Sequence, residues 1–221
     1  VAIDEFQQIG NYPEENVEAL LRTAIQQCRQ TQFIFSGSKR HLMNRMFTSA
    51  SRPFYQSAIC MGLDPIPMDI YADFSVHLFE ERDRRIDVSA VEKVYRLFNG
   101  CTWFMQMMMN ELFALTASGT CCGTDRLDEA WYNVIRAQEG SYKDLLSRLA
   151  PKQKIVLQAI AREGEAVGIT SSAFMKKYNL PSASSVQSAV KPLLKSDLIT
   201  QEGDAYRVYD YFFAEWLKRM Y

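Results

Sequence analysis

The strongest constraint on the fold is the alternation of apolar strand-like and helix-like segments in the first 67 residues. Residues 1–3 and 32–35 read as short apolar strands, and apolar residues recur at helical spacing over 16–30. A second helix is expected over about 41–47, and the apolar run SAICMGL at 57–63 is a candidate third strand. Such alternation predicts βαβ units with a parallel sheet.

Polar residues follow the first two of these strands directly. Asp4 and Glu5 come after VAI, and Ser36-Gly37-Ser38 come after QFIF. In an open α/β sheet, ligands bind beyond the carboxyl ends of the strands, so both clusters are expected to face one crevice. The alternatives are a surface acidic pair that caps the next turn and an ordinary glycine-containing loop.

Residues 68–147 read as an all-α region after the rigid, helix-incompatible segment DPIP at 64–67. Apolar residues repeat at i, i+3 and i+4 in each of its segments. The Met-rich stretch from Cys101 to Ala117 contains Gln106, Asn110 and Glu111, and it is too short for a bilayer-spanning helix. We expect it to be a core helix and not a membrane anchor.

Residues 148–221 show a different order of elements. A helix with Pro151 in its first turn is followed by a short strand, two helices with serine caps, and a hairpin around Glu202-Gly203-Asp204. An amphipathic helix, YDYFFAEWLKRM, closes the region. Helix, strand, helix, helix and a two-stranded wing is the order of a winged helix-turn-helix.

The second of the two capped helices carries a polar outer stripe. Its expected inner face is Val186, Val190, Leu193 and Leu194. Its expected outer face is Ser184, Gln187, Ser188, Lys191 and Lys195. Small polar residues with two lysines suit phosphate contacts in DNA, but two lysines are few, and a protein partner fits this stripe at least as well.

Composition limits the remaining functions. The net charge is −1, but residues 147–221 contain 11 Lys and Arg against 7 Asp and Glu, and the rest contain 14 against 19. No global field therefore draws the whole chain to nucleic acid or membrane, and the last third is the basic part. The five cysteines lack CxxC spacing and only His41 and His77 could join them. We expect a cytoplasmic protein without a zinc site.

VAIDEFQ resembles a Walker B strand, and FIFSGS resembles the sensor-1 strand that follows it by one helix. With the RPFY stretch at 52–55, a helical lid and a terminal winged helix, nearly the whole chain resembles the archaeal/bacterial ATPase family. That family belongs to the STAND branch of AAA+-like P-loop ATPases, and Bacteroides-type ATP-binding proteins are the most similar in style.

The resemblance implies an α/β remnant of a P-loop NTPase core at 1–67, an all-α lid at 68–147 and a winged helix at 148–221, mostly α overall. It also implies ATP and Mg²⁺ as ligands. Asp4 would hold Mg²⁺ through water, and Glu5 would polarise the water that attacks the γ-phosphate. Ser36 and Ser38 would contact that phosphate.

The sequence departs from the family pattern at two places. The family often has a Gly-x-Pro motif in the lid that packs near the adenine base of ATP. Thr102 occupies the position of that proline, so an adenine contact through this motif is not supported. Gln56 and Ser57 follow Tyr55 where the family often has an arginine. Arg52 is then the nearest candidate for a γ-phosphate sensor, with Lys39 and Arg40 as further cations; the alternative for all three is solvated surface.

The 221 residues contain no GxxxxGK[ST] phosphate-binding loop. We therefore expect an N-terminally truncated fragment that is inactive alone and binds no nucleotide tightly. The P-loop strand of such a core lies between the sensor-1 strand and the strand after it. Three outcomes follow for the sheet: these strands close up, another copy supplies a strand by exchange or homo-oligomerisation, or the missing half is present as a separate chain.

Two classes of function stand on the sequence alone. The first is an ATP-dependent molecular switch. The second is a nucleotide-independent winged-helix protein, similar to a transcription regulator, that binds DNA or a protein and uses the βα segment only as scaffold.

Overall fold

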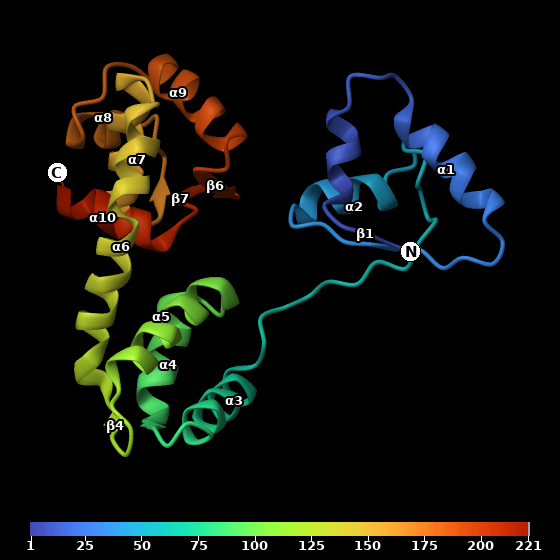
Figure 1. The fold of residues 1–221 in the computed structure, drawn as a ribbon. Helices are drawn as coiled ribbons and strands as arrows, with labels where there is room; N and C mark the ends of the chain where they lie inside the picture. The colour runs from blue at the N-terminus through green and yellow to red at the C-terminus, as the bar shows by residue number, and fades with distance from the viewer. Residues whose placement is uncertain (221) are drawn as a thin grey trace. The chain divides into compact units, whose positions relative to one another are not determined.

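The computed structural model describes residues 1–220, without the side chain of His41; Tyr221 lies outside the described residues. The chain divides into two compact units, residues 1–64 and 65–221. Each unit has a hydrophobic core of its own. Figure 1 shows the path of the chain through both.

The first unit is a small α/β unit. It contains β1 (Ala2–Ile3), the 3-10 helix η1 (Phe6–Asn11), α1 (Val17–Gln27), β2 (Ile34–Phe35) and α2 (Arg40–Thr48). β1 pairs with β2 in parallel, Ala2 opposite Ile34 and Ile3 opposite Phe35. The predicted parallel pairing of these two strands and the two predicted helices are thus confirmed.

Four phenylalanines hold this unit together. Phe6, Phe47 and Phe54 are buried, and Phe35 packs against them from β2. The ring of Phe6 lies 4.2 Å from that of Phe35 and 5.1 Å from that of Phe54, the second contact edge-on. Contacts of this kind between aromatic rings stabilise the fold beyond what the burial of their apolar surface contributes. They fix the end of β1 and the end of β2 on one core.

The prediction of a third strand at 57–63 is wrong. These residues have no regular structure, and Ile59, Met61 and Leu63 are 97%, 82% and 84% exposed. An extended apolar segment becomes a strand only when a neighbour pairs with its backbone groups, and no described segment pairs with this one. The two strands on either side of the expected gap therefore do not close up on each other.

The helical part of the second unit contains one feature that the sequence did not indicate. Its helices are α3 (Met68–Glu80), α4 (Val88–Leu97), α5 (Thr102–Leu115) and α6 (Leu127–Ser147). Two short strands, β3 (Arg85–Ile86) and β4 (Cys121–Cys122), pair in parallel between them, followed by the 3-10 helix η2 (Thr124–Arg126). The all-helical prediction for 68–147 is corrected here: a two-residue bridge is too short to leave a periodic pattern.

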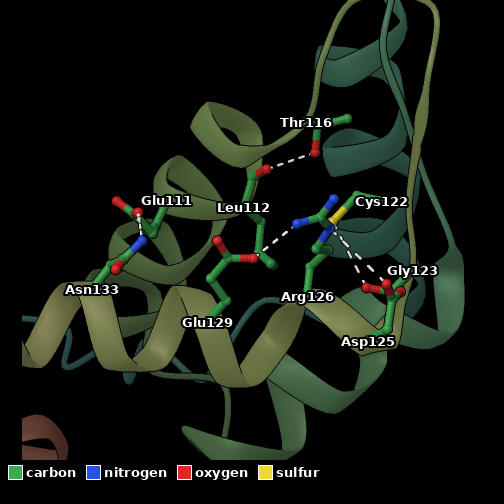
Figure 2. A network of polar contacts seen from close by, with 9 residues as sticks. All are labelled: Glu111, Leu112, Thr116, Cys122, Gly123, Asp125, Arg126, Glu129 and Asn133. Carbon is green, nitrogen blue, oxygen red and sulfur yellow. Dashed lines mark hydrogen bonds and ion pairs between the residues drawn. The ribbon is translucent and has the colours of Figure 1, made fainter.

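Polar contacts fix the corner where β4 leads into α6 (Figure 2). Arg126 Nη1 donates to Glu129 at 2.8 Å, and Asn133 donates to Glu111 of α5 at 2.7 Å. Thr116 at the end of α5 donates its hydroxyl to the Leu112 carbonyl at 2.6 Å. The Asn133–Glu111 bond joins α6 to α5, and the other two stabilise the start of α6 and the end of α5. The Met-rich helix α5 is core as expected, with Met105, Met108 and Met109 buried.

The last part of the chain is a winged helix. It comprises α7 (Pro151–Glu163), β5 (Ala166–Val167), α8 (Ser172–Lys177), α9 (Ala183–Lys195), β6 (Ile199–Glu202), β7 (Ala205–Val208) and α10 (Tyr211–Met220). The three strands form a sheet in the order β5-β7-β6, antiparallel throughout. Ser171 and Ser182 cap α8 and α9 with their hydroxyls, as the serine pattern predicts.

One hydrophobic core runs through residues 65–221. Buried residues of α4 to α6 and of α7 to α10 belong to the same cluster, and the expected boundary near residue 148 lies inside this unit. Among the described residues, no helix is both long and apolar enough to cross a bilayer.

Candidate functional site

The two polar clusters predicted at the strand ends meet in the structure. The amide of Ser36 donates to the Ile3 carbonyl at 3.0 Å, and the amide of Phe6 donates to the Ser36 carbonyl at 2.9 Å. These bonds continue the β1–β2 ladder by one step past each strand. They place Asp4 and Glu5 beside Ser36 and Ser38, at the carboxyl ends of two parallel strands.

Asp4 is an exposed carboxylate with two hydrogen-bond donors. The hydroxyl of Ser36 donates to its Oδ1 at 2.6 Å, and the amide of Glu5 donates to the same oxygen at 2.9 Å. Both bonds stabilise the charged form, with the serine bond the larger cause, and lower the pKa of Asp4. Asp4 is therefore ionised at neutral pH and fixed in orientation.

Glu5 is oriented by its backbone and by two side chains. Its φ of 48° lies in the left-handed region, which is uncommon for a residue other than glycine. The hydroxyl of Ser38 donates to Glu5 Oε2 at 3.0 Å, and the side-chain amide of Gln7 donates to the same oxygen. Six other non-glycine residues share a positive φ, so the two side-chain bonds, more than the backbone, distinguish Glu5.

Sequence reasoning missed Gln7 and Gly37. Gln7 is buried, and its Oε1 has no hydrogen-bond partner among the described residues. A Cβ on Gly37 would overlap Gln7 Oε1 and would lie 2.7 Å from Met43 Sδ. A buried polar residue two positions after the acidic pair carries no sequence signal of its own. The SGS pattern marked Gly37 only as part of a loop.

We expect Gly37→Ala to destabilise residues 1–64 by about 1–3 kcal/mol, because the buried Gln7 and the partly buried Met43 must move to admit the methyl group. Hydrogen exchange of the α2 amides measures the effect. Gly10→Ala is the matched control, since a Cβ there meets nothing within 4 Å. Equal exchange in both variants would show that Gly37 is not sterically required.

The structure does not bring Arg52 into this cluster. Arg52 forms an ion pair with Glu18 of α1, whose side chain is 10% exposed. Arg40 donates to the Leu63 carbonyl at 3.2 Å and lies 3.5 Å from Asp64. No contact among the described residues joins either arginine to Asp4 or Glu5. Arg52 thus has a structural role here, as the partner of a largely buried carboxylate.

The outer face of α9 is a second candidate site. All five residues predicted to face outward are exposed: Ser184, Gln187, Ser188, Lys191 and Lys195. Val186, Val190 and Leu193 are buried and Leu194 is partly buried, as predicted. The tip of the wing beside this helix is acidic and exposed, with Glu202 and Asp204 on either side of Gly203.

Comparison with known proteins agrees with these elements. Residues 140–219 match a family described as a probable winged helix domain. No curated protein matches the chain in sequence. Among solved structures, a Walker-type ATPase of Pyrococcus abyssi is similar, with a TM-score of 0.64 and 19% identity over 99% of this chain and 62% of that one. A RuvB mutant of Thermotoga maritima has a TM-score of 0.46 and 17% identity over 94% of this chain and 66% of that one.

The chain spans 62% of the length of the Pyrococcus structure. At 19% identity the similarity concerns the fold. It covers the strand ends that carry Asp4 and Ser36 as well as the helical and winged-helix parts. This chain has a P-loop ATPase-like fold with a C-terminal winged helix.

Proposed function

We propose that this chain is the Walker B and sensor-1 part of an ATP-binding P-loop ATPase of the STAND type, which acts as a nucleotide-dependent switch. The observation that carries the proposal is the pair of hydrogen bonds, Ser36 to Asp4 and Ser38 to Glu5, at the ends of adjacent parallel strands. A surface acidic pair would not need two serines that follow a strand more than 30 residues further along the chain.

The residues fit a magnesium nucleotide. Among residues 1–220 no group of three or more His, Cys, Asp or Glu could enclose a metal ion. Mg²⁺ keeps several of its waters and is commonly held by one or two carboxylates together with substrate phosphates, so one exposed, ionised Asp4 suits it. When bound, Mg²⁺ with ATP supplies the phosphoryl group and neutralises its charge.

The side chains of this chain would then orient water. Asp4 would accept hydrogen bonds from the waters on the metal. The hydroxyl of Ser36, which donates to Asp4 Oδ1, would keep the carboxylate in this orientation. Glu5 would accept a hydrogen bond from the attacking water, while Ser38 and Gln7 fix its carboxylate. Phosphoryl transfer depends mainly on such positioning and on electrostatic stabilisation.

The phosphate cradle must come from residues other than these. The 221 residues contain no GxxxxGK[ST], and that loop's amides and lysine hold the β- and γ-phosphates. In our proposal the chain alone therefore does not hydrolyse ATP. Residues 65–221 share one core, so the lid and the winged helix would respond to the nucleotide as one body.

Replacing Asp4 with asparagine tests this function in a protein that contains both a P-loop and these residues. We expect ATP affinity to lose its dependence on Mg²⁺, because a neutral amide attracts the hydrated cation weakly. Isothermal titration with and without Mg²⁺ measures this, with Asp204→Asn at the wing tip as the control. Unchanged magnesium dependence in Asp4→Asn would instead favour the nucleotide-independent alternative.

The exposed stripe on α9 supports a second candidate function, contact with DNA or with a protein through the winged helix. Lys191 and Lys195 have no ion-pair partner among the described residues, so both can meet phosphates. The acidic wing tip would repel a DNA backbone, which favours a protein partner or a DNA contact limited to α9.

We expect Lys191→Ala with Lys195→Ala to weaken any DNA binding equally for all sequences. The slope of log affinity against log salt should fall by about 2, because each phosphate contact contributes about 0.9. Fluorescence anisotropy over a salt series measures this. Lys143→Ala is the control, since Lys143 is paired with Glu139 on α6. If the double variant keeps the full slope, the stripe does not contact DNA.

A further inference from the structure

Helix α3 has two faces, and only one of them is used by the core. Tyr71, Ala72, Ser75 and Phe79 are buried and face the other helices of residues 65–221. Along one edge of this buried face, Ile70, Phe74 and Leu78 are 57%, 56% and 43% exposed. Their spacing of i, i+4 and i+8 places them in one row along the helix.

The row gathers three large apolar side chains on one exposed strip of α3. Single exposed apolar residues are normal, but a contiguous patch of large ones marks an interaction site. The fold does not need these three side chains, because the buried face of α3 already anchors the helix. The row at i, i+4 and i+8 is also the ridge that helices use when they pack against each other.

A second row on the exposed side of α3, beyond His77, is acidic. Asp69, Asp73 and Glu80 are exposed, and none of them has an ion-pair partner among the described residues. His77 lies between the two rows and pairs with Glu81, at 3.3 Å. The outer face of α3 therefore presents an apolar ridge flanked by uncompensated negative charge.

We propose that this face binds an amphipathic helix of a protein partner, which carries an apolar ridge beside a row of lysines or arginines. The apolar ridges would interdigitate, and the basic row would lie against Asp69, Asp73 and Glu80. Helix-on-helix recognition of this kind uses apolar anchors for affinity and the charges for orientation and partner choice.

Charge excludes the other common occupants of an apolar helix face. A second copy of α3 would bring six carboxylates into one interface without cations from either helix. Anionic lipid and nucleic acid would both be repelled by the acidic row. The proposal does not depend on the nucleotide site, which lies in residues 1–64.

The probe is a synthetic 14-residue helical peptide with leucines at i, i+4 and i+8 and lysines in the adjacent row, labelled with fluorescein. We expect the 221-residue chain to bind it, and binding to fall by about tenfold or more in Phe74→Ser. Asp69→Asn with Asp73→Asn should weaken binding several-fold and reduce its dependence on salt. All three side chains are exposed, so the variants should keep the wild-type melting curve.

Two controls separate docking on α3 from general adhesion. Ile155→Ser changes a side chain on α7 that is 43% exposed, as Leu78 is, and should leave peptide binding unchanged. A peptide with glutamate in place of lysine should bind at least tenfold more weakly. Equal binding of both peptides, or wild-type binding by Phe74→Ser, would overturn the proposal. Self-association of the chain that Phe74→Ser abolishes would overturn it too, in favour of a second copy.

Discussion

Replacing Phe98 with alanine is expected to destabilise residues 65–221 by about 3–5 kcal/mol. Phe98 ends α4 and is fully buried. Its ring lies 5.5 Å from Trp131 of α6, and 5.6 and 5.2 Å from Tyr211 and Phe212 of α10. Truncation removes the contacts of one ring with both the lid and the winged helix and leaves a cavity between them.

Because one core runs through both parts, they should lose stability together. Hydrogen exchange of amides in α5 and in α9 measures each part separately, and we expect the same loss of protection in both. Leu97→Ala is the matched control: its side chain is 47% exposed, and the change should stay within about 0.5 kcal/mol. If only α5 loses protection, the lid and the winged helix are separate cooperative units.

The structure confirms the sequence-based predictions that rest on a periodic apolar pattern or on residues that mark the end of a helix or strand. The pairing of β1 with β2 follows from two apolar runs separated by a helix, and the meeting of Asp4 with Ser36 follows from that pairing. The winged helix was predictable because capping serines mark the starts of α8 and α9 and the Glu202-Gly203-Asp204 turn marks the hairpin of β6 and β7. In each of these cases local chemistry and the wider fold point to the same structure.

The remaining features depend on contacts between residues far apart in sequence. Residues 57–63 have the apolar composition of a strand, but the described chain offers no neighbour for their backbone groups. The sequence offered Arg52 as a cation for the phosphate site, whereas in the structure it forms an ion pair with Glu18 of α1. The role of Gln7 is recognised only in the structure, where its side-chain amide donates a hydrogen bond to Glu5. A single sequence contains none of these pairings explicitly.

Replacing Glu5 with glutamine is expected to lower the kcat of ATP hydrolysis by roughly 10²-fold or more, in a protein that contains both a P-loop and these residues. The amide keeps the shape that Ser38 and Gln7 hold, but it is too weak a base to polarise the attacking water. Nothing in the change removes a phosphate or metal contact, so the dissociation constant for ATP with Mg²⁺ should stay within a few-fold.

Steady-state kinetics and titration with ATP separate these two effects. Glu14→Gln is the control, because Glu14 is exposed ahead of α1 and touches none of the four site residues. Hydrolysis at the wild-type rate in Glu5→Gln would remove Glu5 from the chemistry. The Ser38 bond would then be only a loop contact.

In the proposed function, Asp4 and Glu5 face a magnesium nucleotide. A crystal structure of the P-loop-containing protein with Mg²⁺ and a slowly hydrolysed ATP analogue tests it most directly. We expect the Asp4 carboxylate within hydrogen-bond distance of waters on the metal, and Glu5 within about 3 Å of a water that faces the γ-phosphate. A nucleotide bound at the P-loop with both carboxylates turned to bulk solvent, bonded only to Ser36 and Ser38, would contradict it.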